Sequence, residues 1–261
     1  MNATATTTDT ATTTTDTTDT SAESFVDEEI DSFGIALPEH WLQLPLQRND
    51  FDHAVDGLRR KWRADGMSRT DQRRCELLLQ RVHAELTDEG VTFAAASFEK
   101  ARRDGVEQVE ANSEWLMCVC TFSVLTKRQL GTDMRLSIPV LFGAFGTRSS
   151  GNDLARITDI RPPEVCTLGA GRSVRLRRLY ESTKLQSRVE RWFGETYMTP
   201  IGTAGDVIGM LQFTTTNVEL APAFSDLFLQ LAHTVTFFRP GDPTVFNTAP
   251  YDDGPDETGD A

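Results

Sequence analysis

Residues 197–238 constrain the fold of this chain more than any other stretch, because strand, turn and helix patterns follow one another there without interruption. An extended run from Tyr197 to Ile201 leads into Gly202–Asp206, whose two glycines suit a hairpin turn. The next run, 206–214, alternates with the period of a strand, and its apolar face comprises Val207, Leu211 and Phe213. This stretch predicts an antiparallel pair of strands.

A helix follows this hairpin. Pro222 suits a first helical turn, where its missing N–H group removes no hydrogen bond. Four apolar residues then recur at helical spacing: Phe224, Leu227, Phe228 and Leu231. A last β-rich run extends from Thr234 to Phe238. A helix with one apolar stripe buries that stripe against a sheet, so we predict an α+β fold.

The N-terminal half predicts two further helices joined as a hairpin. Asp50 is the expected cap of the first helix, and Ser68 or Thr70 that of the second. Asp65-Gly66 separates the two helices. The two apolar stripes are Phe51, Ala54, Val55, Leu58 and Trp62, and Cys75, Leu78, Leu79, Val82 and Leu86.

The remaining apolar patterns predict strands. They lie at 37–46, 91–98, 114–125, 164–168, 172–180 and 189–197, with Gly169-Ala170-Gly171 as a turn and a short helix within 127–145. The predicted fold is therefore an antiparallel sheet of about six to seven strands, flanked by the helical hairpin and the C-terminal helix.

The acidity of the chain lies in its two ends. The formal net charge is −13, yet residues 32–240 contain 25 acids and 26 bases. Residues 1–32 are rich in Thr and Asp and residues 241–261 in Pro, Gly and Asp, so both segments are predicted to be disordered. We expect one α+β domain at 33–240 between two acidic tails.

The sequence predicts a cytoplasmic protein without a membrane span. It has no secretory signal pattern and no apolar run of about 18 residues. The four cysteines, Cys75, Cys118, Cys120 and Cys166, are expected to be free thiols of a reducing compartment. The acidic tails argue against nucleic-acid binding, and no nucleic-acid partner is expected.

No catalytic motif is visible in the sequence. Cys118-x-Cys120 places two thiols on one face of a strand, but no histidine or cysteine pair at zinc spacing accompanies it. Neither Gly-x-Ser-x-Gly, His-Glu-x-x-His nor a phosphate-binding loop occurs. We therefore predict no enzyme activity, no cofactor and no metal.

Basic residues cluster in two places and are the candidate protein-docking residues. The predicted helical hairpin contributes Arg59, Arg60, Arg73 and Arg74, and the strand at 172–180 contributes Arg175 and Arg177. The two strand arginines share a face, which is expected to be the solvent face. A solvated surface balanced by neighbouring acids is the alternative.

Thr6 and Thr13 are candidate phosphorylation sites. Each is followed three residues later by aspartate in a segment predicted to be accessible. Phosphorylation there would create a ligand for an arginine cluster on a reader protein or on this protein's own hairpin. A solubilising tail is the alternative.

Two segments resemble proteins of the PsbP-like fold superfamily. They are Leu37-Pro38-Glu39-His40-Trp41 near the start, and 209–217 followed by 224–238 near the end. Within the LpqN-like group of this superfamily the chain looks most similar to uncharacterised actinobacterial proteins, and it departs from the LpqN-type lipoproteins in lacking a lipoprotein signal. The resemblance implies a curved antiparallel sheet flanked by helices and a role in binding other proteins.

The sequence thus favours a non-enzymatic protein-binding or accessory module. The alternative is a small-molecule-binding protein or hydrolytic enzyme with a pocket between the sheet and the helical hairpin. A pocket with convergent polar groups would favour the alternative, and an exposed arginine-rich face would favour the binding module.

Overall fold

The computed structural model describes residues 32–86, 91–100, 115–146, 155–182, 190–202 and 204–238. Seven strands form its central sheet: β2 (Leu42–Gln43), β3 (Val91–Lys100), β4 (Trp115–Thr126), β5 (Ala155–Leu168), β6 (Gly171–Ser182), β7 (Glu190–Ile201) and β8 (Val207–Thr215). Their order is β2-β3-β4-β8-β7-β6-β5, and every pairing is antiparallel. The predicted α+β fold with a sheet of six to seven strands is confirmed.

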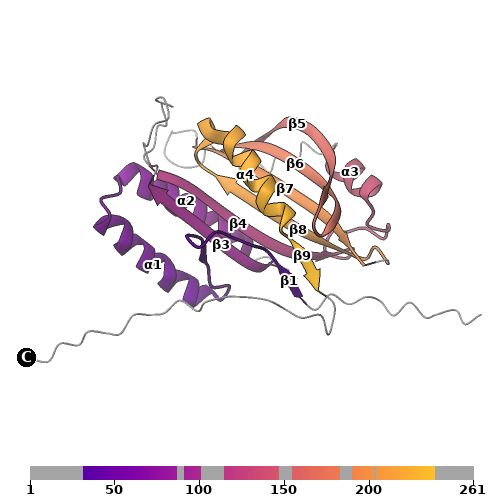
Figure 1. Ribbon diagram of the computed structural model, residues 1–261, viewed down its shortest axis with the longest axis horizontal. Coiled ribbons are helices and arrows are strands. Elements are labelled where there is room, and N and C mark those ends of the chain that lie inside the picture. The colour runs from indigo at the N-terminus through magenta and orange to yellow at the C-terminus, as the bar shows by residue number, and fades with distance from the viewer. Residues whose placement is uncertain are drawn as a thin grey trace, which may run out of the picture.

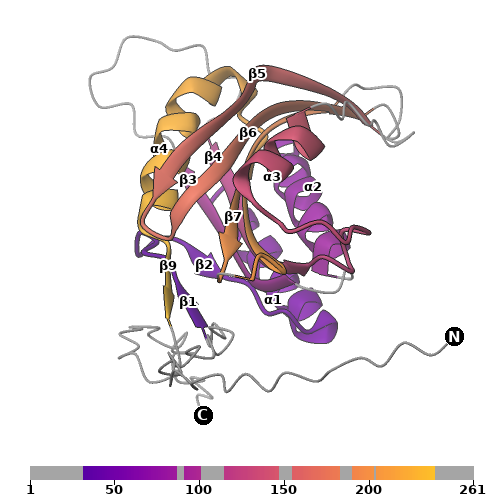
Figure 2. The same ribbon diagram turned by 90° about the vertical axis from the view of Figure 1, so that its right-hand side faces the viewer.

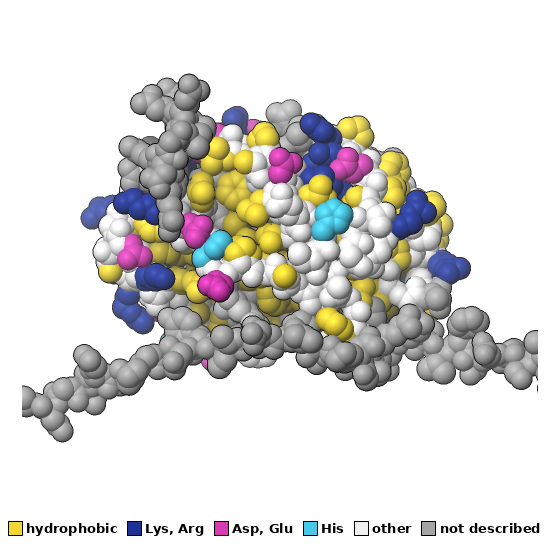
Figure 3. Space-filling view, viewed as in Figure 1, with side chains coloured by type: hydrophobic (Ala, Val, Ile, Leu, Met, Phe, Trp, Pro, Cys, Tyr) yellow, Lys and Arg dark blue, Asp and Glu magenta, His cyan; other side chains and the backbone are white. Residues whose placement is uncertain are grey.

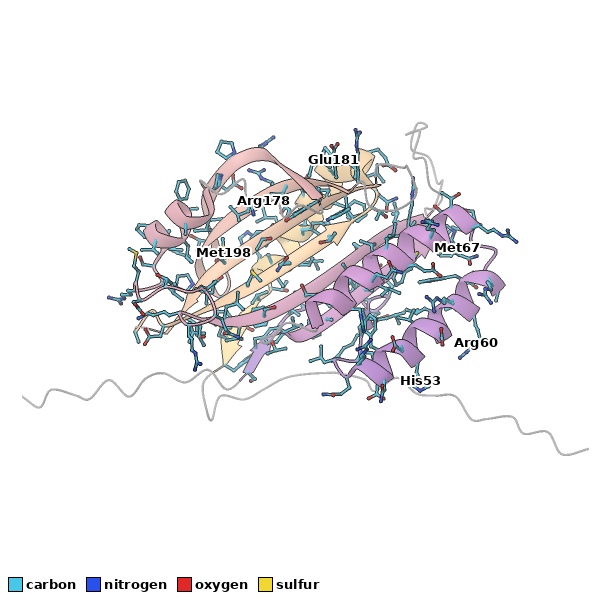
Figure 4. All side chains as sticks on the ribbon, turned by 180° about the vertical axis from the view of Figure 1, so that it is seen from behind. His53, Arg60, Met67, Arg178, Glu181 and Met198 are labelled. Carbon is cyan, nitrogen blue, oxygen red and sulfur yellow. The ribbon has the colours of Figure 1, made fainter. Side chains whose placement is uncertain are left out.

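Helices cover both faces of this sheet. Figures 1 and 2 show α4 (Ala221–His233) crossing one face alone. The opposite face carries α1 (Arg48–Ala64) and α2 (Arg69–Leu86) at one end and α3 (Ile138–Gly146) at the other, as the view from behind shows (Figure 4). A short 3₁₀ helix, η1 (Val218–Leu220), leads from the sheet into α4.

The face beneath α4 has an aromatic core. Phe228 is fully buried and stacks on Phe213 of β8, with 4.8 Å between ring centroids. Phe224 and Leu231 of the same stripe are also buried against this face. The predicted C-terminal helix is therefore confirmed, together with the face that it buries.

The helical hairpin packs on the opposite face through small strand residues. Ala94 and Ala96 of β3 are fully buried beneath it, and their small side chains let the apolar stripes of both helices approach the sheet. Ser68 caps α2, because its hydroxyl oxygen accepts the Asp71 N–H group at 3.1 Å. The expected Asp50 cap is wrong: α1 already begins at Arg48, so Asp50 lies inside its first turn.

Three strand predictions differ from the structure. The run at 37–46 forms only the two-residue β2, since the segment turns at Pro38 and at the start of α1. The last run forms β9 (Thr236–Phe238), which pairs with β1 (Ser32–Gly34) outside the main sheet. β5 begins at 155 rather than at 164, and register shifts interrupt its pairing around Pro162-Pro163.

Among the described segments, no helix is long and apolar enough to cross a membrane. Nearly all of the two predicted tails, including Thr6 and Thr13, lies outside the described residues.

Candidate functional site

The four hairpin arginines lie on α1 and α2, and two of them have carboxylate partners. Arg59 donates through Nε to Glu76 Oε1 at 3.1 Å and through Nη1 to Asp56 Oδ1 at 2.8 Å. Arg74 Nη1 lies 3.7 Å from Asp71 Oδ1. These contacts partly neutralise both guanidinium groups.

The outer end of the hairpin remains strongly basic. Between residues 60 and 73, five exposed residues are basic and only Asp65 is both exposed and acidic. The five basic residues, hereafter the hairpin tip, are Arg60, Lys61, Arg63, Arg69 and Arg73. Figure 3 shows Lys and Arg side chains gathered over α1, and Figure 4 shows Arg60 on this helix.

The fold places the residues of the hairpin tip at one end of the hairpin. The Arg59–Glu76 contact joins α1 to α2, so the residues between them form one end of the hairpin. Gly66 makes the reversal possible with a φ of 73°, a left-handed conformation that glycine adopts without strain. Both helices therefore contribute basic side chains to the same end of the hairpin.

The two strand arginines lie elsewhere, and their expected solvent exposure is wrong. Arg175 and Arg177 do share a face of β6, but it is the face that α4 covers. Arg175 is only 6% exposed, and it is therefore excluded as a docking residue. Arg177 is partly buried beside it.

Arg175 belongs to a buried ion network centred on Glu195 of β7. The Glu195 carboxylate is fully buried and accepts two hydrogen bonds from Arg175, at 3.0 Å from Nε and 2.9 Å from Nη2. Tyr197 OH donates to the same carboxylate at 2.5 Å, and Ser225 Oγ of α4 donates to its other oxygen. Both carboxylate oxygens are thus fully engaged, as a buried charge requires.

Glu164 extends this network to the sheet edge. Its two oxygens accept hydrogen bonds from Arg175 Nη1 at 3.0 Å and from Arg177 Nη2 at 2.7 Å. Strand register explains the contacts, because Glu164, Arg175 and Tyr197 face one another directly across β5, β6 and β7. Two arginines and two glutamates make the network electrically neutral.

The network changes the ionisation of its members. Burial, together with the negative charge of Glu195, raises the pKa of Tyr197, so the phenol keeps its proton. For Arg175, burial lowers the pKa but the hydrogen bonds and charge of Glu195 outweigh it, and the pKa is raised overall. The protonated phenol and the charged guanidinium are the states that the hydrogen bonds need.

This arrangement anchors α4 rather than presenting a reactive group. Arg175 Nη2 also donates to Ser225 Oγ at 2.8 Å and to the Ser225 carbonyl oxygen at 3.2 Å, so helix and sheet share one polar contact. The sequence carries a signal for this buried carboxylate. Glu195 alternates with Phe193 and Tyr197, which places its carboxylate on an apolar face.

The cysteines do not form a metal site among themselves. All four are free, and Cys118 and Cys120 are buried on the α4 side of β4, as the alternation predicts. In the part of the chain that the structure describes, no three His, Cys, Asp or Glu side chains are grouped to hold a metal ion.

No protein-family model matches this chain, and no curated protein matches it. The case for a function therefore rests on the hairpin tip.

Proposed function

We propose that this protein is a protein-binding module and that the hairpin tip docks an acidic segment of a partner. The observation that carries the proposal is the concentration of five exposed basic residues at one end of the helical hairpin. The resemblance to PsbP-like proteins implies the same class of function.

The chemistry of the hairpin tip suits carboxylates. Arginine presents a planar group that pairs with a carboxylate through two parallel hydrogen bonds. Three of the five, Arg60, Arg63 and Arg69, lie within ten residues of one another on two helices. Such a surface attracts acidic partners over a range of about 8 Å at physiological ionic strength.

The packing beneath the hairpin argues against the alternative function. A pocket between sheet and hairpin needs open volume, but buried apolar side chains occupy this interface. They include Leu58, Trp62, Leu79, Ala96 and Met117, none of which is more than 9% exposed. This favours a binding surface on the outside of the hairpin over a ligand site beneath it.

The test compares charge reversal at the hairpin tip with reversal elsewhere. The variant Arg60→Glu/Arg63→Glu is matched by Arg128→Glu/Arg172→Glu, which changes two exposed arginines away from the hairpin. Each protein is titrated with a synthetic peptide of alternating Glu and Ser at low and high salt. We expect the hairpin variant to bind about tenfold more weakly and the matched control to bind like the parent.

The protein's own tails provide a second arm of this experiment. Residues 1–31 carry eight acids and residues 241–261 carry six, so either tail can compete for the hairpin tip. A form lacking both tails should bind the peptide at least as tightly as the full chain. Equal binding by the parent and the hairpin variant, with or without tails, would contradict the proposal.

A further inference from the structure

Three sulfur atoms meet in the core between the helical hairpin and the sheet. Cys75 Sγ of α2 lies 3.2 Å from Met117 Sδ of β4 and 3.7 Å from Met67 Sδ. Met67 belongs to the connection between α1 and α2, and Figure 4 shows it where the two helices meet. Cys75 and Met117 are fully buried and Met67 is 4% exposed.

Hydrogen bonds hold the backbone on both sides of this cluster. Gln72 Nε2 donates to the Met67 carbonyl oxygen at 2.7 Å, which fixes the helix connection. The Met117 N–H group donates to Asn217 Oδ1 at 2.9 Å, and the Met117 carbonyl oxygen accepts from Thr215 Oγ1 at 2.6 Å. The backbone of both methionines is therefore held in place, while their side chains can still rotate.

Cys75 Sγ lies from each thioether sulfur at a distance close to the sulfur–sulfur separation of a three-coordinate metal site. Metal–sulfur bonds of about 2.3 Å in a trigonal plane place the sulfurs about 4 Å apart. The two observed distances, 3.2 and 3.7 Å, need to open by less than about 1 Å to reach this value. Side-chain rotation of the two flexible methionines is sufficient for such a change.

The charge and chemistry of the cluster restrict the metal. One thiol and two thioethers are soft ligands, which select Cu(I) over ions that prefer oxygen. Cys75 binds a metal as the thiolate, so metal binding releases the thiol proton. A monovalent ion with one thiolate is neutral, whereas a divalent ion would leave an uncompensated charge in the apolar core.

We propose that Met67, Cys75 and Met117 form a buried binding site for a soft monovalent metal ion, Cu(I). The Cys75 S–H bond breaks, a Cu–S bond forms, and the proton passes to solvent. Copper stays in the Cu(I) state throughout, so no oxidant or reductant takes part. The metal ion can reach the site only if the helix connection that carries Met67 opens. Of the three sulfur residues, Met67 is the only one whose side chain has measurable exposure.

The test is an anaerobic titration of the full chain with Cu(I) against a chromophoric Cu(I) chelator. We expect one ion and one released proton per chain, and a higher melting temperature with bound metal. Met67→Leu keeps the volume and the fold, and should weaken binding by about tenfold or more. Cys75→Ser should abolish tight binding.

Matched variants separate this site from other sulfur atoms. Cys118→Ser and Met198→Leu change a buried thiol and a buried methionine of the sheet, and both should retain the ion. Cys166→Ser, which removes the half-buried thiol, should also retain it. Redox-inert Ag(I) should give the same order of variants in a thermal-shift assay.

Two results would overturn the proposal. One is a folded parent protein that loses all its copper to the chelator. The other is a folded Met67→Leu variant that binds Cu(I) and Ag(I) as tightly as the parent, which would make the cluster ordinary core packing.

Discussion

The sequence contains two arginine clusters, one in the helical hairpin and one in β6. The two clusters differ in how far the folded protein exposes them to solvent. Arg60 and Arg73 are exposed on two helices, and Arg59 and Arg74 are partly exposed beside carboxylates. Arg175 and Arg177 lie beneath α4, in hydrogen-bonded contact with Glu164. Identical side chains thus serve solvent-facing and buried roles within one chain.

The difference follows from what covers each element. A helix with one apolar stripe has its opposite face in water, so Arg60 and Arg73 are exposed by the same pattern that buries Trp62 and Leu79. A strand in the middle of a sheet has two faces, and either can be covered. The face of β6 that carries Val174 and Leu176 packs against the α3 side, and the face that carries Arg175 packs against α4.

The largest expected effect separates the two sets most clearly. Arg175→Met keeps a long apolar stem but leaves Glu195 without its guanidinium partner, and should destabilise the fold by about 3–5 kcal/mol. The measurement is urea unfolding followed by far-UV circular dichroism. A variant as stable as the parent would mean that the network contributes nothing to anchoring α4.

Alkaline pH tests the same network without removing an ion pair. Because burial raises the pKa of Tyr197, its contribution is complete below the unfolded pKa of about 10 and is lost as pH rises above it. The parent should lose about 1.4 kcal/mol per pH unit there relative to Tyr197→Phe. Parallel stability curves for the two proteins between pH 9 and 11 would contradict this assignment.

The sequence predicted those elements whose patterns have only one interpretation. The stripes around Trp62, Leu79 and Phe228 predicted α1, α2 and α4 and their buried faces correctly. The 206–214 run and the turn before it predicted the β7–β8 pair. Helical period and glycine turns are local properties, so they are readable without knowing the tertiary structure.

The sequence alone is insufficient where a distant segment decides the structure. Whether Arg175 faces water depends on Ser225 of α4, which lies 50 positions away in the chain. The final strand pairs with β1, over two hundred residues earlier, rather than with its neighbour in sequence. The sulfur cluster likewise joins Met117 to Cys75 across 42 positions. No short sequence motif predicts a contact over such a separation.

Substitution of Arg177 should destabilise the protein less than substitution of Arg175 and more than substitution of a hairpin arginine. Its side chain is 10% exposed and its partner Glu164 is 40% exposed, so water screens the pair in part. Arg177→Gln should cost about 1–2 kcal/mol, less than Arg175→Met, because Glu164 retains Arg175. Denaturant midpoints measured side by side would test this order, and a larger loss at 177 than at 175 would reverse it.

Arg59 tests the ion pair between the hairpin helices. Its side chain and that of Glu76 are 38% and 37% exposed, so the pair should contribute about 0.2–1 kcal/mol. Arg59→Gln should therefore lower the melting temperature slightly in low salt and less in 1 M salt. If the melting temperature falls by the same amount at both salt concentrations, the aliphatic stem of Arg59, rather than its charge, stabilises the hairpin.

Arg60→Gln should have the smallest effect on stability and a clear effect on binding. Arg60 is exposed on α1, and arginine and glutamine have similar helix propensities, so unfolding free energy should change by less than about 0.5 kcal/mol. The same change removes one positive charge from the hairpin tip and should measurably lower the affinity for the acidic peptide in low salt. Unfolding curves and peptide titrations on one preparation separate the two quantities. A loss of stability above about 1 kcal/mol would mean that exposure does not distinguish the hairpin arginines from those beneath α4.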